Sequence, residues 1–349
     1  NIEDIAGRLR TISGGWPKVA GDTLFVQQKQ AGRWRVRYLA RPDELFAWMA
    51  EVADVRWSEG DCMCRETKAP RTSVTKGEFF QHLKAATPDR FLAVSDLPHE
   101  PPMSGYHYLP LDLPKATGVH LKRLVDSFNA ATESDRGLML ACLLTMFWGG
   151  HPGTRPGFIF DAESPGSGES ATVDALTSIA GGAFVISDPD QKWADSTKQM
   201  MSSSAANARA VVFDNVRKIV EGQAIESAIT SPTVSGWRVY VGHMVRPNDV
   251  TVIVTANGAQ ASQDMATRLV RICVGRPIAG RDWVTWASEF IEEHRLELVA
   301  DILAMLRAPA TETAGLIGDR FSGWQRAVLA RIPGAASMSK TIFDHLICD

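Results

Sequence analysis

Residues 158–172 read FIFDAESPGSGESAT, an apolar strand followed by a glycine-rich turn and the start of a helix. This order is typical of a phosphate-binding loop (P-loop), whose pattern is G-x-x-x-x-G-K-[ST]. Gly168 and Ser170 fit the pattern, whereas Glu163 stands in place of its first glycine and Glu169 in place of its lysine. Because that lysine faces the β- and γ-phosphates, a glutamate there replaces attraction by repulsion. The stretch therefore predicts a nucleotide-binding architecture that is impaired at one key position.

A second apolar strand, AVVFDNV at 210–216, places Asp214 at its carboxyl end. An acid at this point is where a P-loop NTPase holds Mg²⁺ or the water bound to it. The alternative is an aspartate that caps the following turn. Asn215 follows where many such enzymes have a glutamate that polarises water, and an amide cannot act as a general base. The strand thus predicts Asp214 as a magnesium ligand, followed by an asparagine where a catalytic glutamate is expected.

A third apolar strand, VTVIVTANG at 250–258, ends in Asn257. In NTPases with an inserted strand of this kind, a polar residue at that tip reaches toward the γ-phosphate and orients the attacking water, which is the role expected of Asn257. Arg268 and Arg271 follow in DMATRLVRI. An arginine there can project toward the nucleotide of an adjacent subunit and stabilise transition-state charge. For each arginine, the alternative is a salt bridge at the surface of its own subunit.

Composition indicates an ordinary globular protein, with 45% hydrophobic and 22% charged residues in a chain of 349. No apolar run approaches the ~20 residues of a membrane span, so no membrane partner is expected. The net charge of -3 offers no global electrostatic case for nucleic acid, although a local basic surface stays open. The start, NIEDIAGRLR, is neither a secretory signal nor a transit peptide, and we expect a piece of a longer, cytoplasmic protein. Cys62 and Cys64 lack the second pair that a tetrahedral metal site needs, which favours reduced thiols.

Three regions are predicted: residues 1–117 as a small α+β region ending in a proline-rich linker, residues 118–280 as an α/β core, and residues 281–349 as a helical region. In the first region, strands at 23–27 and 34–40 flank a polar turn and predict a hairpin. The helices expected there are 42–53 and one opened by the capping-box pair Thr75 and Glu78.

The core alternates strands with helices, and its near-continuous apolar strands predict a buried parallel sheet. Strands are expected at 157–161, 210–214, 236–241, 250–256 and 269–274. Helices are expected at 119–130, 133–148 (capped by Thr132 and Asp135), 170–180, 192–206, 222–230 and 283–307.

The three strand-end motifs and the arginines, in this order and spacing, resemble the AAA+ core of superfamily 3 helicases and of the related primase-helicases of phages and plasmids. The match runs from Phe158 to Pro277. A looser resemblance, to P-loop replication proteins of mobile elements, takes in LFAWM, LPHEPP and DRGLMLACLLTMFWGG. The resemblance implies an α/β P-loop NTPase core with a parallel sheet, preceded by a small α+β region and followed by a helical lid. Members use ATP and Mg²⁺, assemble as rings, usually hexamers, and pull DNA through the pore.

The resemblance also implies roles for single residues. Nucleotide binding is implied for Pro165, Gly166, Ser167, Gly168, Glu169, Ser170, Ala171 and Arg271. Mg²⁺ binding is implied for Ser170 and Asp214. Catalytic roles are implied for Asp214, Asn215, Asn257 and Arg268, with Arg268 acting on the neighbouring subunit.

Residues 230–249, TSPTVSGWRVYVGHMVRPND, resemble the segment that these helicases use for a β-hairpin that contacts DNA inside the ring. Arg238, His243 and Arg246 are its candidate DNA-binding residues, because backbone phosphates need cations. Trp237 and Tyr240 offer stacking surfaces. The alternative places both aromatic residues in the core and leaves His243 to close a turn.

We therefore expect an ATP-dependent DNA helicase or translocase that acts as a homo-oligomeric ring on single-stranded or forked DNA. It would serve the replication of a phage, a plasmid or an integrated element. Because of Glu169, the alternative is a non-hydrolysing P-loop module for DNA binding or ring assembly. A nucleotide-dependent switch without unwinding shares the same core. Whether Glu169 is natural or engineered stays open at this point.

Overall fold

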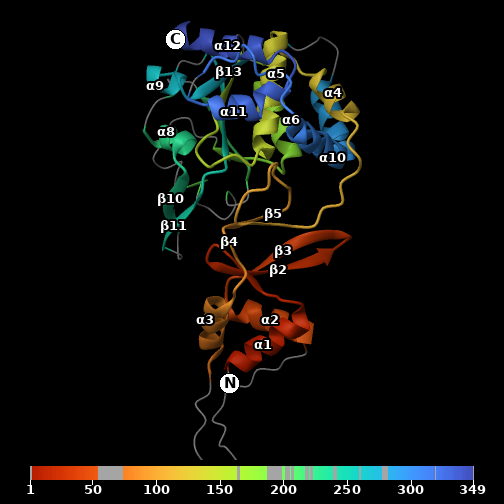
Figure 1. The fold of residues 1–349 in the computed structure, drawn as a ribbon, viewed down its shortest axis with the longest axis vertical. Helices are drawn as coiled ribbons and strands as arrows, with labels where there is room; N and C mark the ends of the chain where they lie inside the picture. Colours follow the sequence, from red (N-terminus) through yellow and green to blue (C-terminus); the bar gives the residue numbers. More distant parts are fainter. Residues whose placement is uncertain are drawn as a thin grey trace, which may run out of the picture. The chain divides into compact units, whose positions relative to one another are not determined.

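The chain divides into two units (Figure 1). Unit 1 comprises Asn1–Asp96 and Ser104–Leu111, and unit 2 comprises Leu97–Met103 and Asp112–Asp349. The proline-rich stretch is thus divided between the units. The computed structural model describes residues 2–53, 74–162, 166–186, 199–200, 205, 208–216, 220, 223–238, 242–258, 261–276, 282–318 and 320–348.

Unit 1 is built on a four-stranded sheet of order β3-β2-β1-β4. Its strands are β1 (Lys18–Ala20), β2 (Thr23–Gln30), β3 (Arg33–Leu39) and β4 (Arg90–Phe91). The predicted hairpin is confirmed, since β2 and β3 pair antiparallel. Ala31 and Gly32 both have positive φ, at 48° and 79°, as a two-residue turn of the hairpin type requires.

Two hydrophobic cores lie among the described residues of unit 1. One joins the sheet to α1 (Ile2–Ser13), α2 (Pro42–Ala53) and α3 (Lys76–Ala86). The other includes residues of the parallel pair β5 (Ala93–Ser95) and β6 (Tyr106–Tyr108) or next to it. The capping box of α3 is confirmed, because Thr75 Oγ1 accepts from the Glu78 backbone N–H at 3.1 Å and Thr75 N donates to Glu78 Oε2 at 2.9 Å.

Unit 2 contains a five-stranded sheet of order β13-β7-β12-β9-β8, in which every neighbouring pair is parallel. Its strands are β7 (Gly157–Ala162), β8 (Phe184–Ile186), β9 (Ala210–Val216), β12 (Thr251–Asn257) and β13 (Leu269–Val274). The predicted buried parallel sheet is confirmed. The strand β8 was not predicted, since it is only three residues long and lies at the sheet edge, where Val185 is exposed.

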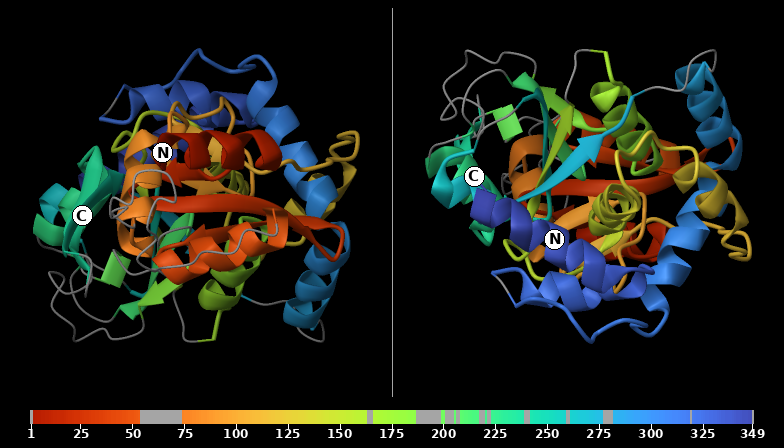
Figure 2. Two further views of the ribbon diagram at one scale, coloured as in Figure 1. Left: turned by 90° about the horizontal axis from the view of Figure 1, so that it is seen from below. Right: turned by 90° about the horizontal axis from the view of Figure 1, so that it is seen from above.

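Helices surround this sheet. They are α4 (Val119–Val125), α5 (Glu133–Phe147), α6 (Glu169–Ile179), α8 (Gln223–Thr230), α9 (Gln263–Ala266), α10 (Trp283–Arg307), α11 (Ser322–Ala327) and α12 (Ala335–Cys348), with a 3-10 turn at Leu329–Arg331. The antiparallel hairpin of β10 (Thr233–Arg238) and β11 (Gly242–Pro247) lies on the opposite side of unit 2 from α10 (Figure 2).

The structure corrects several predicted bounds. The helix expected at 119–130 ends at Val125, because Ser127 Oγ binds the Leu124 carbonyl and the Phe128 side chain turns into the core. The helix over 283–307 is confirmed but has non-helical dihedral angles at His294. The strand expected at 236–241 starts at Thr233 and is described to Arg238. Most of the helix predicted at 192–206, together with Cys62 and Cys64, lies outside the described residues. Of the helices in the described part, none has the length and apolarity to cross a membrane.

The capping box generates a stability prediction. Replacing Thr75→Ala should destabilise unit 1 by about 1 kcal/mol, because the Glu78 N–H at the start of α3 loses its acceptor. Hydrogen bonds from the Thr75 backbone N–H and then from its hydroxyl lower the pKa of Glu78. The stability that these two bonds contribute is therefore present above the ordinary pKa of a glutamate and is lost as the pH falls through the lowered pKa. Urea unfolding at pH 7 and pH 3 measures both effects.

The control is Thr11→Ala in α1, an exposed threonine whose hydroxyl donates to the Gly7 carbonyl of its own helix. It should change stability little at either pH. Equal losses in the two variants would show that the capping box does not stabilise α3.

Candidate functional site

The carboxyl ends of β7, β12 and β9 meet at one edge of the sheet, because the strands are neighbours and run in the same direction. Asn257, the last residue of β12, lies opposite Ala162, the last residue of β7. Asp214 lies near the end of β9. The glycine-rich turn follows β7 at the same edge, although Glu163 and Pro165 lie outside the described residues.

The described part of this turn leads directly into α6. Gly166 and Gly168 have φ of 83° and 91°, values that favour glycine. Among the described residues, no atom lies within 4 Å of the position that a Cβ would take at either glycine, which leaves room beside the backbone. Ser167 between them is buried, and Ala171 belongs to the first turn of α6. The glycine-rich turn and the helix that follows it were both predicted from the sequence.

The Asp214 carboxylate connects the turn to the sheet. Its Oδ1 accepts hydrogen bonds from Ser170 Oγ at 2.8 Å and from Thr255 Oγ1 at 2.7 Å. Thr255 Oγ1 in turn accepts from the Asn215 backbone N–H at 2.8 Å. Asn215 has a positive φ of 57°, its side chain is exposed, and the β9–β12 register shifts beside it. The role of Thr255 in this site was not predicted from the sequence. The signal that could have identified it is a hydroxyl residue within an otherwise apolar strand.

Negative charge gathers around Asp214. Partial desolvation, and then the charge of Asp214, raise the pKa of Asp174 on α6. A divalent cation would relieve this repulsion. No group of three or more His, Cys, Asp and Glu side chains in the described ranges is arranged to hold a metal ion. This is compatible with Mg²⁺, which uses one or two protein ligands and otherwise keeps water and phosphate oxygens.

Glu169 is the first residue of α6, and its side chain contacts Asn257 at the end of β12. Asn257 Nδ2 donates to Glu169 Oε1 at 3.2 Å. The other carboxylate oxygen, Oε2, is buried and has no hydrogen-bond partner among the described residues. Leaving a buried acceptor unsatisfied costs about 1–3 kcal/mol. Glu169, which stands in the lysine position, therefore binds the residue expected to orient water, and one of its oxygens has no donor in the described part of the chain.

Arg271 forms an ion pair inside unit 2. Its Nη2 and Nε lie 2.5 and 3.2 Å from Oδ2 of Asp161, a buried residue of β7. Arg271 pairs with Ile159 and Cys273 with Asp161 along the β13–β7 register. Asp161 was not singled out in the sequence, although an acid within an apolar strand next to the turn marks it.

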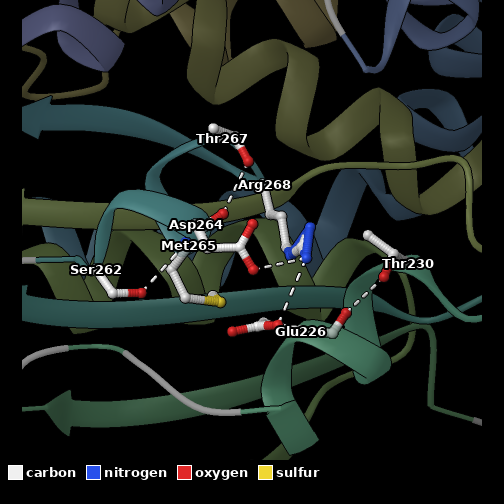
Figure 3. Close-up of polar contacts among 7 residues, drawn as sticks. All are labelled: Glu226, Thr230, Ser262, Asp264, Met265, Thr267 and Arg268. Atoms are coloured by element: carbon white, nitrogen blue, oxygen red, sulfur yellow. Dashed lines mark hydrogen bonds and ion pairs between the residues drawn. The ribbon is translucent and has the colours of Figure 1, made fainter.

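Arg268 also has partners within its own chain (Figure 3). Its Nη2 lies 2.8 Å from Asp264 Oδ2 in α9 and 3.5 Å from Glu226 Oε2 in α8. Only 12% of its side chain is exposed. The structure therefore brings Arg268 to two acids that the sequence reasoning did not name, and not to the Asp214 cluster.

The candidate DNA-binding residues belong to the β10–β11 hairpin. Arg238 and His243 lie at its far end, where Arg238 pairs with Gly242 and Trp237 with His243. The positions of these side chains are outside the description, as is Tyr240. Arg246 Nη2 donates to the Met200 carbonyl at 3.2 Å. The hairpin itself was implied by the resemblance to superfamily 3 helicases, whereas the residue pattern predicted only one strand there, at 236–241.

Comparison with known proteins identifies a similar fold. No protein-family model matches the sequence, and no curated protein matches it. An apo structure of the C-terminal region of NrS-1 matches with a TM-score of 0.54 and 15% identity, over 95% of this chain and 73% of that chain. A second apo structure of that region matches with a TM-score of 0.53 and 13% identity, over 96% and 73%. At such identities the likeness concerns the fold alone.

The Asp214 cluster generates a prediction about Thr255. Thr255→Val removes a donor to Asp214 and leaves the Asn215 N–H without its acceptor. We expect unit 2 to lose about 1–3 kcal/mol of stability in urea unfolding.

Thr251→Val is the matched control, because Thr251 is also buried on β12 and its Oγ1 has no hydrogen-bond partner in the part of the chain that is described. That variant should be neutral or stabilising. If both substitutions cost the same, the hydroxyl bridge does not hold the site together.

Proposed function

We propose that unit 2 binds ATP and Mg²⁺ at the carboxyl edge of its sheet, and that the protein is an ATP-dependent DNA helicase or translocase. Its setting would be the cytoplasmic replication of a phage, a plasmid or an integrated element. The observation that carries the proposal is the hydrogen bond of 2.8 Å between Ser170 Oγ and Asp214 Oδ1. In P-loop NTPases, Mg²⁺ is held by a hydroxyl at the start of the helix after the glycine-rich turn together with an acid at the end of another strand of the same sheet.

Strand order supports the same proposal. Because β12 lies between β7 and β9, Asn257 lies beside the turn and Thr255 beside Asp214. A polar residue at the tip of the intervening strand is within the region where a γ-phosphate and its attacking water would lie. The Asn257 amide, which contacts Glu169 at the start of α6, would orient the water there. Asn215 lies on β9, and its side chain is exposed.

The residues present fit the proposed ligands in part. Ser170 and Asp214 supply the oxygen ligands that Mg²⁺ prefers, and the room beside Gly166 and Gly168 suits a phosphate group. When bound, Mg²⁺ neutralises charge on the phosphate oxygens. Glu169 does not fit, because its carboxylate would face the terminal phosphate. ATP binding in this chain therefore requires the Glu169 side chain to turn away from Asn257.

A non-hydrolysing module for DNA binding or ring assembly is the second candidate. The contact between Glu169 and Asn257 favours this second candidate. In that contact, the amide proposed to orient water is bound instead to the carboxylate that repels phosphate. Under either candidate, Arg238, His243 and Arg246 of the β10–β11 hairpin are proposed to contact single-stranded or forked DNA in a ring, which we expect to be hexameric.

The first experiment compares ATP binding and hydrolysis, with and without single-stranded DNA, for the unaltered chain and Glu169→Lys. The new lysine replaces repulsion by a charge-assisted contact of about 1.5–3 kcal/mol, so ATP affinity should rise by about 10- to 150-fold. It also frees Asn257, so hydrolysis should appear.

Glu292→Lys, an exposed position on α10, changes the net charge by the same amount and should have no effect. Hydrolysis by Glu169→Lys alone supports the helicase proposal. If neither chain hydrolyses ATP and the lysine does not improve binding, the nucleotide site is wrong.

The proposed action of Arg268 on a neighbouring subunit has its own test in the Glu169→Lys background. Arg268→Ala and Asp214→Asn should each abolish hydrolysis, and mixing the two should restore part of it, since a mixed ring contains intact interfaces. Should mixing restore nothing, while Arg268→Ala lowers the melting temperature, Arg268 serves only its ion pairs with Asp264 and Glu226.

A further inference from the structure

The end of the β2–β3 hairpin in unit 1 presents a polar, cationic face. Gln28 pairs with Arg35, and Gln30 with Arg33, so these four side chains share one face of the two-stranded ribbon. Arg33, Arg35 and Gln30 are exposed. We call these four residues the ribbon face. In Figure 1 the end of the hairpin extends past the helices of its own unit.

The same face is apolar nearer the core. Leu24 pairs with Leu39, and both pack with α1, α2 and α3. In the next row, Val26 lies opposite Arg37, whose Nη1 is 2.6 Å from Glu51 Oε2 of α2. Beyond that row, neither Arg33 nor Arg35 has a carboxylate partner within the described part of the chain. The positive charge of the ribbon face is therefore uncompensated by the elements described around it.

Trp34, the aromatic residue near the end of the hairpin, lies on the opposite face of the two strands. Trp34 and Val36 alternate with the arginines and pack against the second core of unit 1, which contains Phe25. The ribbon face thus carries guanidinium and amide groups and no aromatic ring. Binding of single strands relies on aromatic platforms for the bases, so this composition argues against a single-stranded ligand.

We propose that the ribbon face binds duplex DNA through the major groove. That groove admits a two-stranded β-ribbon, and guanidinium and amide groups are those that pair with guanine and adenine edges there. Residues two apart on a strand lie about 6.8 Å apart, so Arg33 and Arg35 can also reach separate phosphates. The deep, narrow major groove of duplex RNA excludes such a ribbon. This site is separate from the proposed nucleotide site, and its DNA binding needs no ATP.

A structural explanation for the arginines competes with this inference. The strand β3 lies at the edge of its sheet, and charged side chains on an edge strand prevent association with other strands. That role requires charge but no DNA affinity, so it can be separated by experiment.

The test is fluorescence anisotropy of a short labelled DNA duplex with the full chain, without nucleotide, across a series of salt concentrations. Arg33→Gln with Arg35→Gln should weaken duplex binding by about 10-fold and reduce the slope of log affinity against log salt by about 2. The control, Arg8→Gln with Arg326→Gln, removes the same charge from exposed positions on α1 and α11 and should bind as the unaltered chain does.

Equal binding by the two double variants would overturn the proposal, as would a loss confined to single-stranded DNA or to duplex RNA. Concentration-dependent association of the Arg33/Arg35 variant in ultracentrifugation, with unchanged DNA affinity, would assign these arginines to edge protection instead. Because the assay contains no nucleotide, a failure of Glu169→Lys to hydrolyse ATP leaves its result unaffected.

Discussion

The hydrogen bonds to the Asp214 carboxylate are the constraint on which the candidate site depends. Ser170 donates from the first turn of α6 and Thr255 donates from β12, while Thr255 also accepts the backbone N–H that follows Asp214. Each group in this network restricts the next, so the turn, the helix start and two strand ends take up one arrangement. Groups from these elements can face a common ligand only while that arrangement holds.

Glu169 shows how a residue can suit its local structure and oppose the proposed ligand. An acid in the first turn of a helix is favourable, because it faces the positive end of the helix dipole. Glu169 also accepts a hydrogen bond from Asn257. The same charge repels a phosphate, which would approach the same helix end for the same electrostatic reason. Local preference and proposed function thus conflict at this position, while the neighbouring positions agree.

The two arginines of the core differ in what their ion pairs imply. Arg271 is held across adjacent strands by the buried Asp161, beside the start of the glycine-rich turn, so it supports the strand from which the turn emerges. Arg268 is held by Glu226 and Asp264 on α8 and α9. If the Arg268 side chain turned toward a neighbouring subunit, it would leave its ion pairs with Glu226 and Asp264. Breaking partly buried ion pairs is costly unless new partners replace the lost ones. A ring interface would therefore need to supply an anion at that point.

Local patterns were sufficient to predict much of the fold. Apolar runs between turn residues predicted β7, β9, β12 and β13, and helical periodicity predicted α10, because these signals depend only on neighbours along the chain. The end of α4 and the strand β8 were missed, since the first depends on burial of Phe128 and the second on pairing with β9.

The sequence also identified Asp214 and Asn257 as candidates, from their positions at the ends of apolar strands, and Ser170, from its place in the P-loop pattern. Which side chains meet was decided by the order of the sheet. Thr255 reaches Asp214 across 41 positions, and Asn257 reaches Glu169 across 88. Such contacts arise only when β12 inserts between β7 and β9, and that placement results from packing of the whole unit, which no local pattern contains.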